Sequence, residues 1–577
     1  MFDLVIRNGT VVDGTGKARF RADVAVQGGR IVEVGKVTGA ARRTIDADGL
    51  LVTPGFVDIH THYDGQVSWD SLLAPSSING VTSIAMGNCG VGFAPARVDK
   101  HDWLISLLEG VEDIPGAALA EGLTWDWESF PDYMDALAKR SYAVDVGAQI
   151  PHAALRCFVM GERGANHEEH PTEGEIAEMA RLTRQSLEAG ALGFTTSRTF
   201  AHRTRDGANI GTLTAGQREL VGILGALKES GKGVIQLISD AYLTPDDTFA
   251  DTEMSLIANM AKATGRPLSF SLQQTDDAPD RWRFILERVQ AMVAGGLDVK
   301  AQVAPRPIGV IESFSTTVNP FFMTPAYREL LALPLEARLL KLAEPEVRAR
   351  LIAQHREAHP GGLLEGLAHS FNRMHRLTDP ADYEPSEDNS IAAEARRLGK
   401  EPVDHAYDVL LEEGGHRLLY MPLVNYARGH LGDVHGMMTA PNTLFGLSDG
   451  GAHCGTICDG SFPTTTLGLW SKGSKAGLSI PLEHLVHGYT QRNAAHVGWM
   501  DRGVVAPGML ADLNIIDLDQ LSLSPPRVVQ DLPAGGSRLL QTARGYRWTI
   551  KNGLVTFENG EHLGDLPGRL VRGTRAA

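Results

Sequence analysis

Thr53-Pro-Gly-Phe-Val-Asp-Ile-His-Thr-His62 ends an apolar run with two histidines one residue apart. Val52 and the apolar residues between positions 56 and 59 favour a buried strand. Side chains two residues apart on a strand point to the same side, so His60 and His62 can bind one cation. Imidazole nitrogen suits zinc or a similar divalent metal. The sequence therefore predicts a metal site at the end of this strand.

Further apolar stretches follow at intervals that favour alternating strands and helices. With the first strand they make eight candidate strands, and amphipathic segments separate them. This pattern predicts a TIM-like (β/α)8 barrel of the α/β class within residues 55–504. The further strand candidates are residues 82–86, 145–150, 192–196, 234–238, 268–272, 299–303 and 444–447, and the amphipathic segments include residues 173–189, 251–263 and 281–294.

Both ends of the chain consist of short alternating strands joined by glycine turns. We expect residues 1–54 and 505–577 to form one small β-sandwich domain, with the barrel inserted between them. Residues from about 320 to 419 do not follow the alternation of strands and helices, because they are charged and helix-rich. They are predicted to be an insertion between the seventh and eighth strands that forms a lid over the mouth of the barrel.

The composition indicates a cytoplasmic enzyme that acts on a small molecule. The chain has 577 residues, 43% of them apolar, and a formal net charge of -16. Such acidity disfavours nucleic acid as a partner. We expect no membrane partner either, because no apolar run approaches the length of a membrane span and the chain starts with a strand pattern. A homo-oligomer is compatible with all of this.

Asp449 is the second candidate for chemistry. It follows Thr443-Leu-Phe-Gly-Leu-Ser448 and precedes two glycines, so it lies where a buried strand ends. An isolated Asp-Gly pair is usually a turn. In barrels, however, the carboxyl ends of the strands face the active site, and together with His60 and His62 the functional interpretation is favoured.

The sequence resembles the amidohydrolase superfamily, and within it the N-acyl-D-amino-acid deacylase branch. The resemblance rests on the segment ending at His62, on Gly87-Asn-Cys-Gly90, on residues 147–161, on Gly190-Ala-Leu-Gly-Phe194 and on Leu447-Ser-Asp-Gly450. It implies a metal-dependent hydrolase of C–N bonds on a (β/α)8 barrel. It also implies that Asp449 is both a metal ligand and the catalytic base, and that Cys89 is a ligand of the tightly held metal.

The chain departs from this family in one respect. Related enzymes carry metal-binding histidines on the fifth and sixth strands, whereas the corresponding stretches here contain Gln236 and Gln273 and no histidine. A glutamine amide does not match the affinity of imidazole for these metals. One cation, most simply zinc, held by His60, His62 and Asp449, with Cys89 as a possible fourth ligand, is favoured. Weak metal binding, or none, is the rival interpretation.

Other polar residues lie just past predicted strand ends and are candidates for substrate binding. They are His152, Arg198, Arg306 and His453. Loop residues at such places are as often solvated or engaged in packing as they are functional. The planar guanidinium of arginine suits a substrate carboxylate, so Arg198 and Arg306 are the candidates for that contact.

The predicted reaction is amide hydrolysis. The metal lowers the pKa of a bound water, the hydroxide attacks the amide carbonyl, and Asp449 protonates the departing nitrogen. An N-acyl amino acid is the expected substrate, with the D configuration implied by the resemblance. A cyclic amide, a carbamate or an aryl amide is the alternative within hydrolases, and a noncatalytic amidohydrolase-like assembly protein is the alternative from another class.

Overall fold

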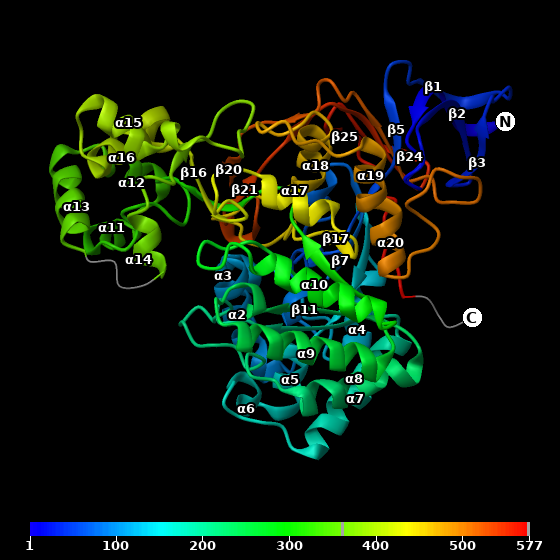
Figure 1. Cartoon of the computed structure of the whole chain (residues 1–577), viewed down its shortest axis with the longest axis horizontal. Helices are drawn as coiled ribbons and strands as arrows, with labels where there is room; N and C mark the ends of the chain where they lie inside the picture. Colours follow the sequence, from blue (N-terminus) through cyan, green and yellow to red (C-terminus); the bar gives the residue numbers. More distant parts are fainter. Residues whose placement is uncertain (359–362, 574–577) are drawn as a thin grey trace.

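The computed structural model describes residues 1–358 and 363–573. Its centre is a set of parallel strands in two sheets (Figure 1). One sheet has the order β6-β7-β8, with β6 Phe56–Asp58, β7 Val81–Met86 and β8 Asp145–Ala148. The other has the order β17-β13-β12-β11-β10-β9, with β9 Ile150–Pro151, β10 Gly193–Arg198, β11 Val234–Ser239, β12 Leu268–Ser271, β13 Val299–Val303 and β17 Thr443–Phe445.

The two sheets follow one another, but strand pairing does not close them into a barrel. Only Gln149 separates β8 from β9, so the first sheet continues directly into the second. At the other side, a single bridge between Thr61 and Gly450 joins the chain beyond β6 to the chain beyond β17. Leu447 and Asp449 adopt positive φ angles of 62° and 47°, so the chain bends out of the extended conformation there. The Asn493 side chain donates to the carbonyl oxygens of Val57 in β6 and Phe445 in β17, so it lies where these two strands would pair, and the parallel strands form no closed ladder.

Helices alternate with the parallel strands, as the amphipathic pattern predicts. The longest begin at side-chain caps: Thr172 forms a capping box with Glu175 at the start of α7, and Asp246 caps α9. The helices around the strands are α1 Ala74–Ser77, α2 His101–Glu112, α3 Gly116–Gly122, α4 Phe130–Ala138, α5 His152–Met160, α6 Glu162–Ala165, α7 Glu173–Glu188, α8 Gln217–Ser230, α9 Asp247–Thr264, α10 Arg281–Ala294, α17 Gly432–Thr439, α18 Phe462–Trp470, α19 Leu482–His487 and α20 Asn493–His496.

The two ends of the chain meet in one nine-stranded sheet, which lies beside the parallel strands (Figure 1). The contact between the ends is the antiparallel pairing of β5 with β18, in which Val52 lies opposite Ile515. Strands from both ends of the chain thus belong to a single mixed sheet. Its strands are β1 Phe2–Val11, β2 Phe20–Gln27, β3 Arg30–Gly35, β4 Ala41–Asp46, β5 Leu51–Pro54, β18 Leu513–Ile516, β23 Tyr546–Lys551, β24 Leu554–Glu558 and β25 Glu561–His562.

Residues 308–424 contain a helical lobe with its own apolar core, which we call the insertion lobe. Figure 1 shows its helices gathered beside the rest of the molecule, and Phe314, Phe321 and Tyr407 contact one another at its centre. A lid function for this lobe stays a prediction. The elements are β14 Ile308–Glu312, α11 Pro325–Leu330, α12 Leu335–Leu342, α13 Pro345–Glu357, α14 Leu363–Ala368, β15 His375–Arg376, α15 Ile391–Leu398, α16 Pro402–Leu410 and β16 Leu419–Val424.

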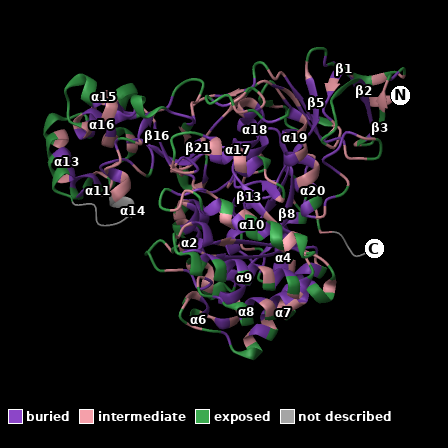
Figure 2. Ribbon diagram, viewed as in Figure 1, coloured by how far each residue is buried: buried purple, intermediate pink, exposed green. Residues whose placement is uncertain are grey.

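Burial follows this architecture. Figure 2 shows the parallel strands as buried and the outer faces of the surrounding helices as exposed. Within residues 1–358 and 363–573, no helix combines the length and the apolar character that a membrane crossing requires.

Candidate metal centre

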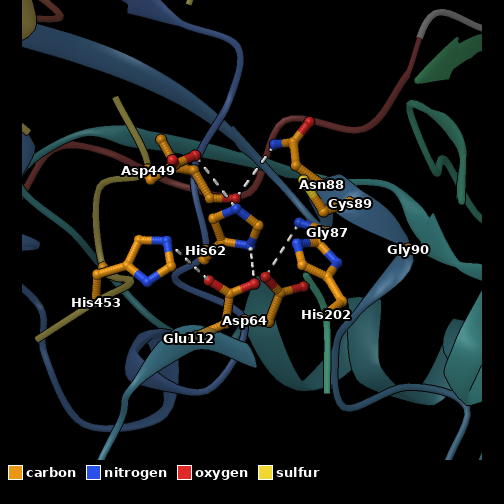
Figure 3. A network of polar contacts seen from close by, with 12 residues as sticks. His62, Asp64, Gly87, Asn88, Cys89, Gly90, Glu112, His202, Asp449 and His453 are labelled. Atoms are coloured by element: carbon orange, nitrogen blue, oxygen red, sulfur yellow. Dashed lines mark hydrogen bonds and ion pairs between the residues drawn. The ribbon is translucent and has the colours of Figure 1, made fainter. Parts of the chain in front are cut away.

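The predicted ligands lie at the carboxyl ends of neighbouring strands. His60 and His62 follow β6, Cys89 follows β7 and Asp449 follows β17. These residues come from segments far apart in the sequence, yet Figure 3 shows Cys89, His62 and Asp449 in one cluster. The parallel arrangement of the strands is the cause, because it places their carboxyl ends at the same edge.

The donor atoms of the cluster converge on one small volume. Ligand atoms of His60, His62 and Cys89 all lie within 4.8 Å of one another, and all three residues are buried. Asp449 Oδ1 lies 3.2 Å from His60 Nε2 and 3.5 Å from His62 Nε2. Cys89 Sγ lies 3.3 Å from His60 Nε2. Two imidazole nitrogens, one sulfur and one carboxylate oxygen make a donor set that suits zinc.

The backbone around two of these donors is held in left-handed conformations. Cys89 has φ of 55° and Asp449 has φ of 47°, which non-glycine residues adopt rarely. The glycines beside Cys89 explain the tight turn: a Cβ on Gly87 would lie 2.4 Å from the Gln149 carbonyl oxygen, and one on Gly90 would lie 2.7 Å from the Thr196 Cα. Such strained positions concentrate at functional sites.

Each histidine has a partner for the ring nitrogen that faces away from the cluster. His60 Nδ1 lies 2.6 Å from Gln302 Oε1, and His62 Nδ1 lies 3.1 Å from Glu112 Oε1. The Gln302 oxygen and the Glu112 carboxylate favour a proton on each Nδ1, so Nε2 of each ring would be the atom that binds a metal. Both imidazoles are therefore oriented as metal ligands.

Removing the carboxylate behind His62 is expected to weaken metal binding. Glu112→Gln replaces an anion by a neutral amide, and loss of such a partner typically lowers metal affinity by about 10–100-fold. Competition with a chelator measures this affinity. Glu109→Gln is the matched control, because Glu109 lies on the same helix α2 and pairs with Arg205 instead. Equal affinities in both variants would contradict the role of Glu112.

The charges of the cluster attract positive charge. Burial on its own lowers the pKa of His60, but Cys89 and Asp449 outweigh it and raise that pKa to about 9. Burial on its own would raise the pKa of Asp449, yet His60, His62 and His453 hold it below its usual value. The contacts with His60 and His62 likewise lower the pKa of the Cys89 thiol despite its burial. A divalent cation satisfies the same anionic donors, so the residues present fit a metal ion.

Two buried carboxylates hold the backbone that carries the ligands. Asp58 accepts a hydrogen bond from the His60 amide at 3.2 Å and another from the Ser448 hydroxyl. Asp64 accepts a hydrogen bond from the Gly87 amide at 3.1 Å. These contacts tie the segments after β6, β7 and β17 together and so hold the ligand residues in place.

The two glutamines that stand in place of histidines have different surroundings. Gln236 Oε1 accepts a hydrogen bond from the Cys89 amide at 2.8 Å, so this side chain positions the cysteine. Gln273 is half-buried and follows the strand β12 and Leu272.

The two predicted substrate arginines are engaged elsewhere. Arg198 forms an ion pair with Glu253 through Nε, 2.9 Å from Oε2, and also donates to the Ala215 carbonyl. Arg306 is buried, pairs with Asp459 at 2.8 Å and stacks on the Tyr383 ring. These contacts occupy both guanidinium groups, so a role in holding a substrate carboxylate finds no support in them.

The two predicted substrate histidines have different positions. His152 lies in a buried network, with Nδ1 2.9 Å from Thr196 Oγ1 and Nε2 3.2 Å from Glu219 Oε1. His453 is part of the cluster, since its Nε2 lies 3.9 Å from Glu112 Oε2 and Figure 3 shows it beside Asp449. His453 alone of these two stays near the metal ligands.

The structure brings a further histidine, His202, to the cluster, and the sequence patterns did not predict it. Figure 3 places it beside Asp64 at the cluster, and its Nδ1 lies 2.8 Å from Ser197 Oγ. Burial, together with repulsion from His62 and His453, lowers the pKa of His202 to about 3, so its imidazole is neutral. Its position a few residues past the fourth predicted strand was the available signal. No sequence signal marks Glu112, because it lies at the end of a helix, fifty positions after His62.

This chain is an α/β protein whose parallel strands bring histidine, cysteine and aspartate together at one edge. That combination is typical of metal-dependent hydrolases. The chain belongs to the Amidohydrolase family, whose model matches residues 43–557. This membership confirms the family predicted from the sequence and the amide hydrolase class that goes with it.

Relatives and solved structures agree with this family. D-aminoacylase of Alcaligenes xylosoxydans xylosoxydans is 35% identical over 34% of this chain, and the match spans 37% of that enzyme. An uncharacterized protein of Mycobacterium tuberculosis is 26% identical over 91% of this chain and 86% of its own length. The crystal structure of N-acyl-D-glutamate deacylase from Bordetella bronchiseptica, complexed with zinc and a phosphonate inhibitor, matches with a TM-score of 0.64 at 23% identity, covering 99% of each chain.

Proposed function

We propose that this protein hydrolyses N-acyl amino acids with the help of one divalent metal ion, and that the amino acid has the D configuration. The convergence of His60, His62, Cys89 and Asp449 at one edge of the strands carries the proposal. The substrate class is supported by relatives, which include D-aminoacylase, N-acyl-D-glutamate deacylase and N-acyl-D-aspartate deacylase. Each of these aligns with about a third of the chain.

Four residues would hold the metal, namely His60, His62, Cys89 and Asp449. A divalent cation there would polarise the amide carbonyl and lower the pKa of a water molecule. Cys89 and Asp449 supply the negative charge that keeps a cation in a buried site, while Gln302 and Glu112 hold the two rings in the ligating orientation.

Asp449 has a second task as the proton carrier. Its Oδ1 makes the contacts with both histidines, which leaves Oδ2 for proton transfer. The side chain is 19% exposed, against 1% and 2% for the two histidines, so it is the member of the cluster that a substrate can reach. Asp449 takes the proton from the attacking water and gives it to the leaving nitrogen, which balances the hydrolysis. His202 and His453 lie beside the cluster and would contact the substrate there.

We also propose the domain division that the sequence indicates. Residues 1–54 and 505–577 form the β domain, which would be a small sandwich, and residues 55–504 form the catalytic domain, in which the two parallel sheets make up a (β/α)8 barrel. The insertion at residues 320–419 belongs to the catalytic domain. The division is supported by the strand order, which keeps the terminal strands in one sheet and the parallel strands in others, and by the separate apolar cores.

Hydrolysis assays on matched N-acyl D- and L-amino acids, combined with elemental analysis of the purified protein, test the proposal. We expect zinc or a similar metal together with hydrolysis of the D substrates. Activity on cyclic amides, carbamates or aryl amides alone would move the assignment within hydrolases. A metal-free, inert and stably oligomeric product would support the noncatalytic assembly protein instead.

The metal stoichiometry is expected to be no more than one tightly bound ion per chain. A second ion needs several good ligands, and Gln236 already bonds the Cys89 amide. Anomalous scattering at the metal edge measures this directly, and two fully occupied peaks beside His60 would refute it.

Cys89→Ser, which keeps the shape but replaces the sulfur, should weaken zinc binding. Unchanged affinity in that variant would remove Cys89 from the ligand set while leaving the count of one.

A further inference from the structure

A cavity of about 420 Å³ lies at the opposite end of the parallel strands from the metal cluster. Pro267 and Asp298, which line it, directly precede β12 and β13. The carboxyl end of β13 carries Gln302, the partner of His60. Strands of this length separate their two ends by roughly 13–17 Å. A molecule bound in this cavity therefore does not touch the metal ligands.

A second, smaller cavity of about 100 Å³ adjoins the first, because Pro267, Ala495 and His496 line both. The segment from α19 through α20 to Trp499 forms one wall, and the residues before β11, β12 and β13 form the other. We call the two cavities together the basal groove. Their combined size is in the range of small-molecule sites, about 300–1,000 Å³.

The basal groove is basic although the chain as a whole is acidic. The chain carries a formal net charge of -16. Asp298 is the only acidic residue among those that line the groove. The basic lining residues are Lys232, Arg266, Lys300, Arg492 and Arg502. Such a local reversal of sign concentrates anions in the groove.

The cations of the groove differ in how far they are already engaged. Arg502 pairs with Asp145 at 2.6 Å, Lys300 pairs with Asp298, and Arg266 donates from Nε to the Gly233 carbonyl at 2.9 Å. Arg492 and Lys232 have no side-chain hydrogen bond or ion pair with any residue in the described part of the chain. The guanidinium of Arg492 is thus available for a ligand, and its burial lowers its pKa.

Three buried ring nitrogens of the same wall, on two residues, also lack partners. His496 is 6% exposed and Trp499 is 3% exposed. The two ring nitrogens of His496 have no hydrogen-bond partner among the described residues, and the same is true of Trp499 Nε1. An unsatisfied buried donor is costly in folded proteins, so the N–H groups of these two rings are available to an acceptor bound in the groove. Burial lowers the pKa of His496 to about 3, which leaves a neutral ring with one N–H donor.

We propose that the basal groove binds a small organic anion, one with a phosphate or carboxylate head group on an apolar or planar body. Arg492 meets the head group through its planar fork, and the N–H donors of His496 and Trp499 supply hydrogen bonds. The apolar body packs against Met500, Val504 and Met509, which also line the larger cavity. This site is independent of the hydrolytic site and does not rest on the proposed function.

Calorimetric titration of the metal-loaded full chain tests the proposal. The probes are phenyl phosphate and benzoate, with benzyl alcohol as the neutral analogue. We expect saturable binding of one phosphate or carboxylate probe per chain and none of the alcohol. The tighter of the two probes identifies the head group. No saturable binding of either anion would overturn the proposal, since the unpartnered donors would then be served by water alone.

Variants assign the binding to the groove. Arg492→Gln should weaken binding by about 10-fold or more, as expected for loss of a charge-assisted contact. His496→Gln should weaken it by a smaller factor. Arg527→Gln is the matched control, because Arg527 is exposed and lies outside the groove. His60→Ala should retain binding. Loss of binding in His60→Ala, or unchanged binding in Arg492→Gln with its melting temperature preserved, would overturn the assignment.

Discussion

His60→Ala and His62→Ala are each expected to abolish metal binding and to lower hydrolysis at least about 10³-fold, while the chain stays folded. Each substitution removes one of two buried imidazoles that converge with Cys89 and Asp449. Lewis-acid assistance is worth several kcal/mol, which sets the size of the effect. The ligands lie beyond the end of β6, so they contribute little to strand pairing. Metal content by elemental analysis and kcat/KM by product release are the measurements.

A distant histidine provides the control for these variants. His416→Ala removes a largely exposed ring in the insertion lobe and should leave metal content and rate unchanged. Thermal melting of all variants shows whether the fold is kept. If both His60→Ala and His62→Ala retain a full complement of metal, the assignment of the centre is wrong.

Asp449→Asn is expected to lower kcat by about 10² to 10⁴-fold, the usual worth of a positioned proton carrier. Asparagine keeps the shape and some hydrogen bonding but is unable to accept the water proton. The loss of one anionic ligand should also weaken metal binding, so the assay is run at saturating metal. The pKa of Asp449 lies below its usual range because of the surrounding histidines, so the carboxylate is ionised in the free enzyme.

Asp459→Asn is the matched comparison for Asp449. Asp459 is a buried aspartate on the same connection, and its ion pair is with Arg306 at 2.8 Å instead of with His60 or His62. We expect Asp459→Asn mainly to lower the stability of the fold and to leave kcat close to that of the unmodified protein. A rate for Asp449→Asn within about twofold of the unmodified protein, at saturating metal, is inconsistent with proton transfer by this residue.

The strands and the main ligands followed from local patterns. Alternation places His60 and His62 on one side of a strand, and this needs only neighbouring residues. The order of apolar stretches likewise predicted β7, β10, β11, β12 and β13 and the helices between them. The open ladder between β6 and β17 did not follow from local patterns, because it depends on Asn493, a residue far away in the sequence whose side chain bonds the carbonyl oxygens of both strands.

The amino-acid sequence by itself determined the family, the parallel strands and the positions of His60, His62 and Asp449 at strand ends, because these depend on periodicity and short motifs. Only the tertiary structure decided which polar residues serve the site. Glu112 reaches His62 from the end of a helix, and His202 turns toward the cluster, whereas Arg198 is held by Glu253, 55 positions away. The reason is physical: a side chain's role is set by the partners that folding brings within hydrogen-bond distance, and no local pattern specifies contacts between segments so far apart.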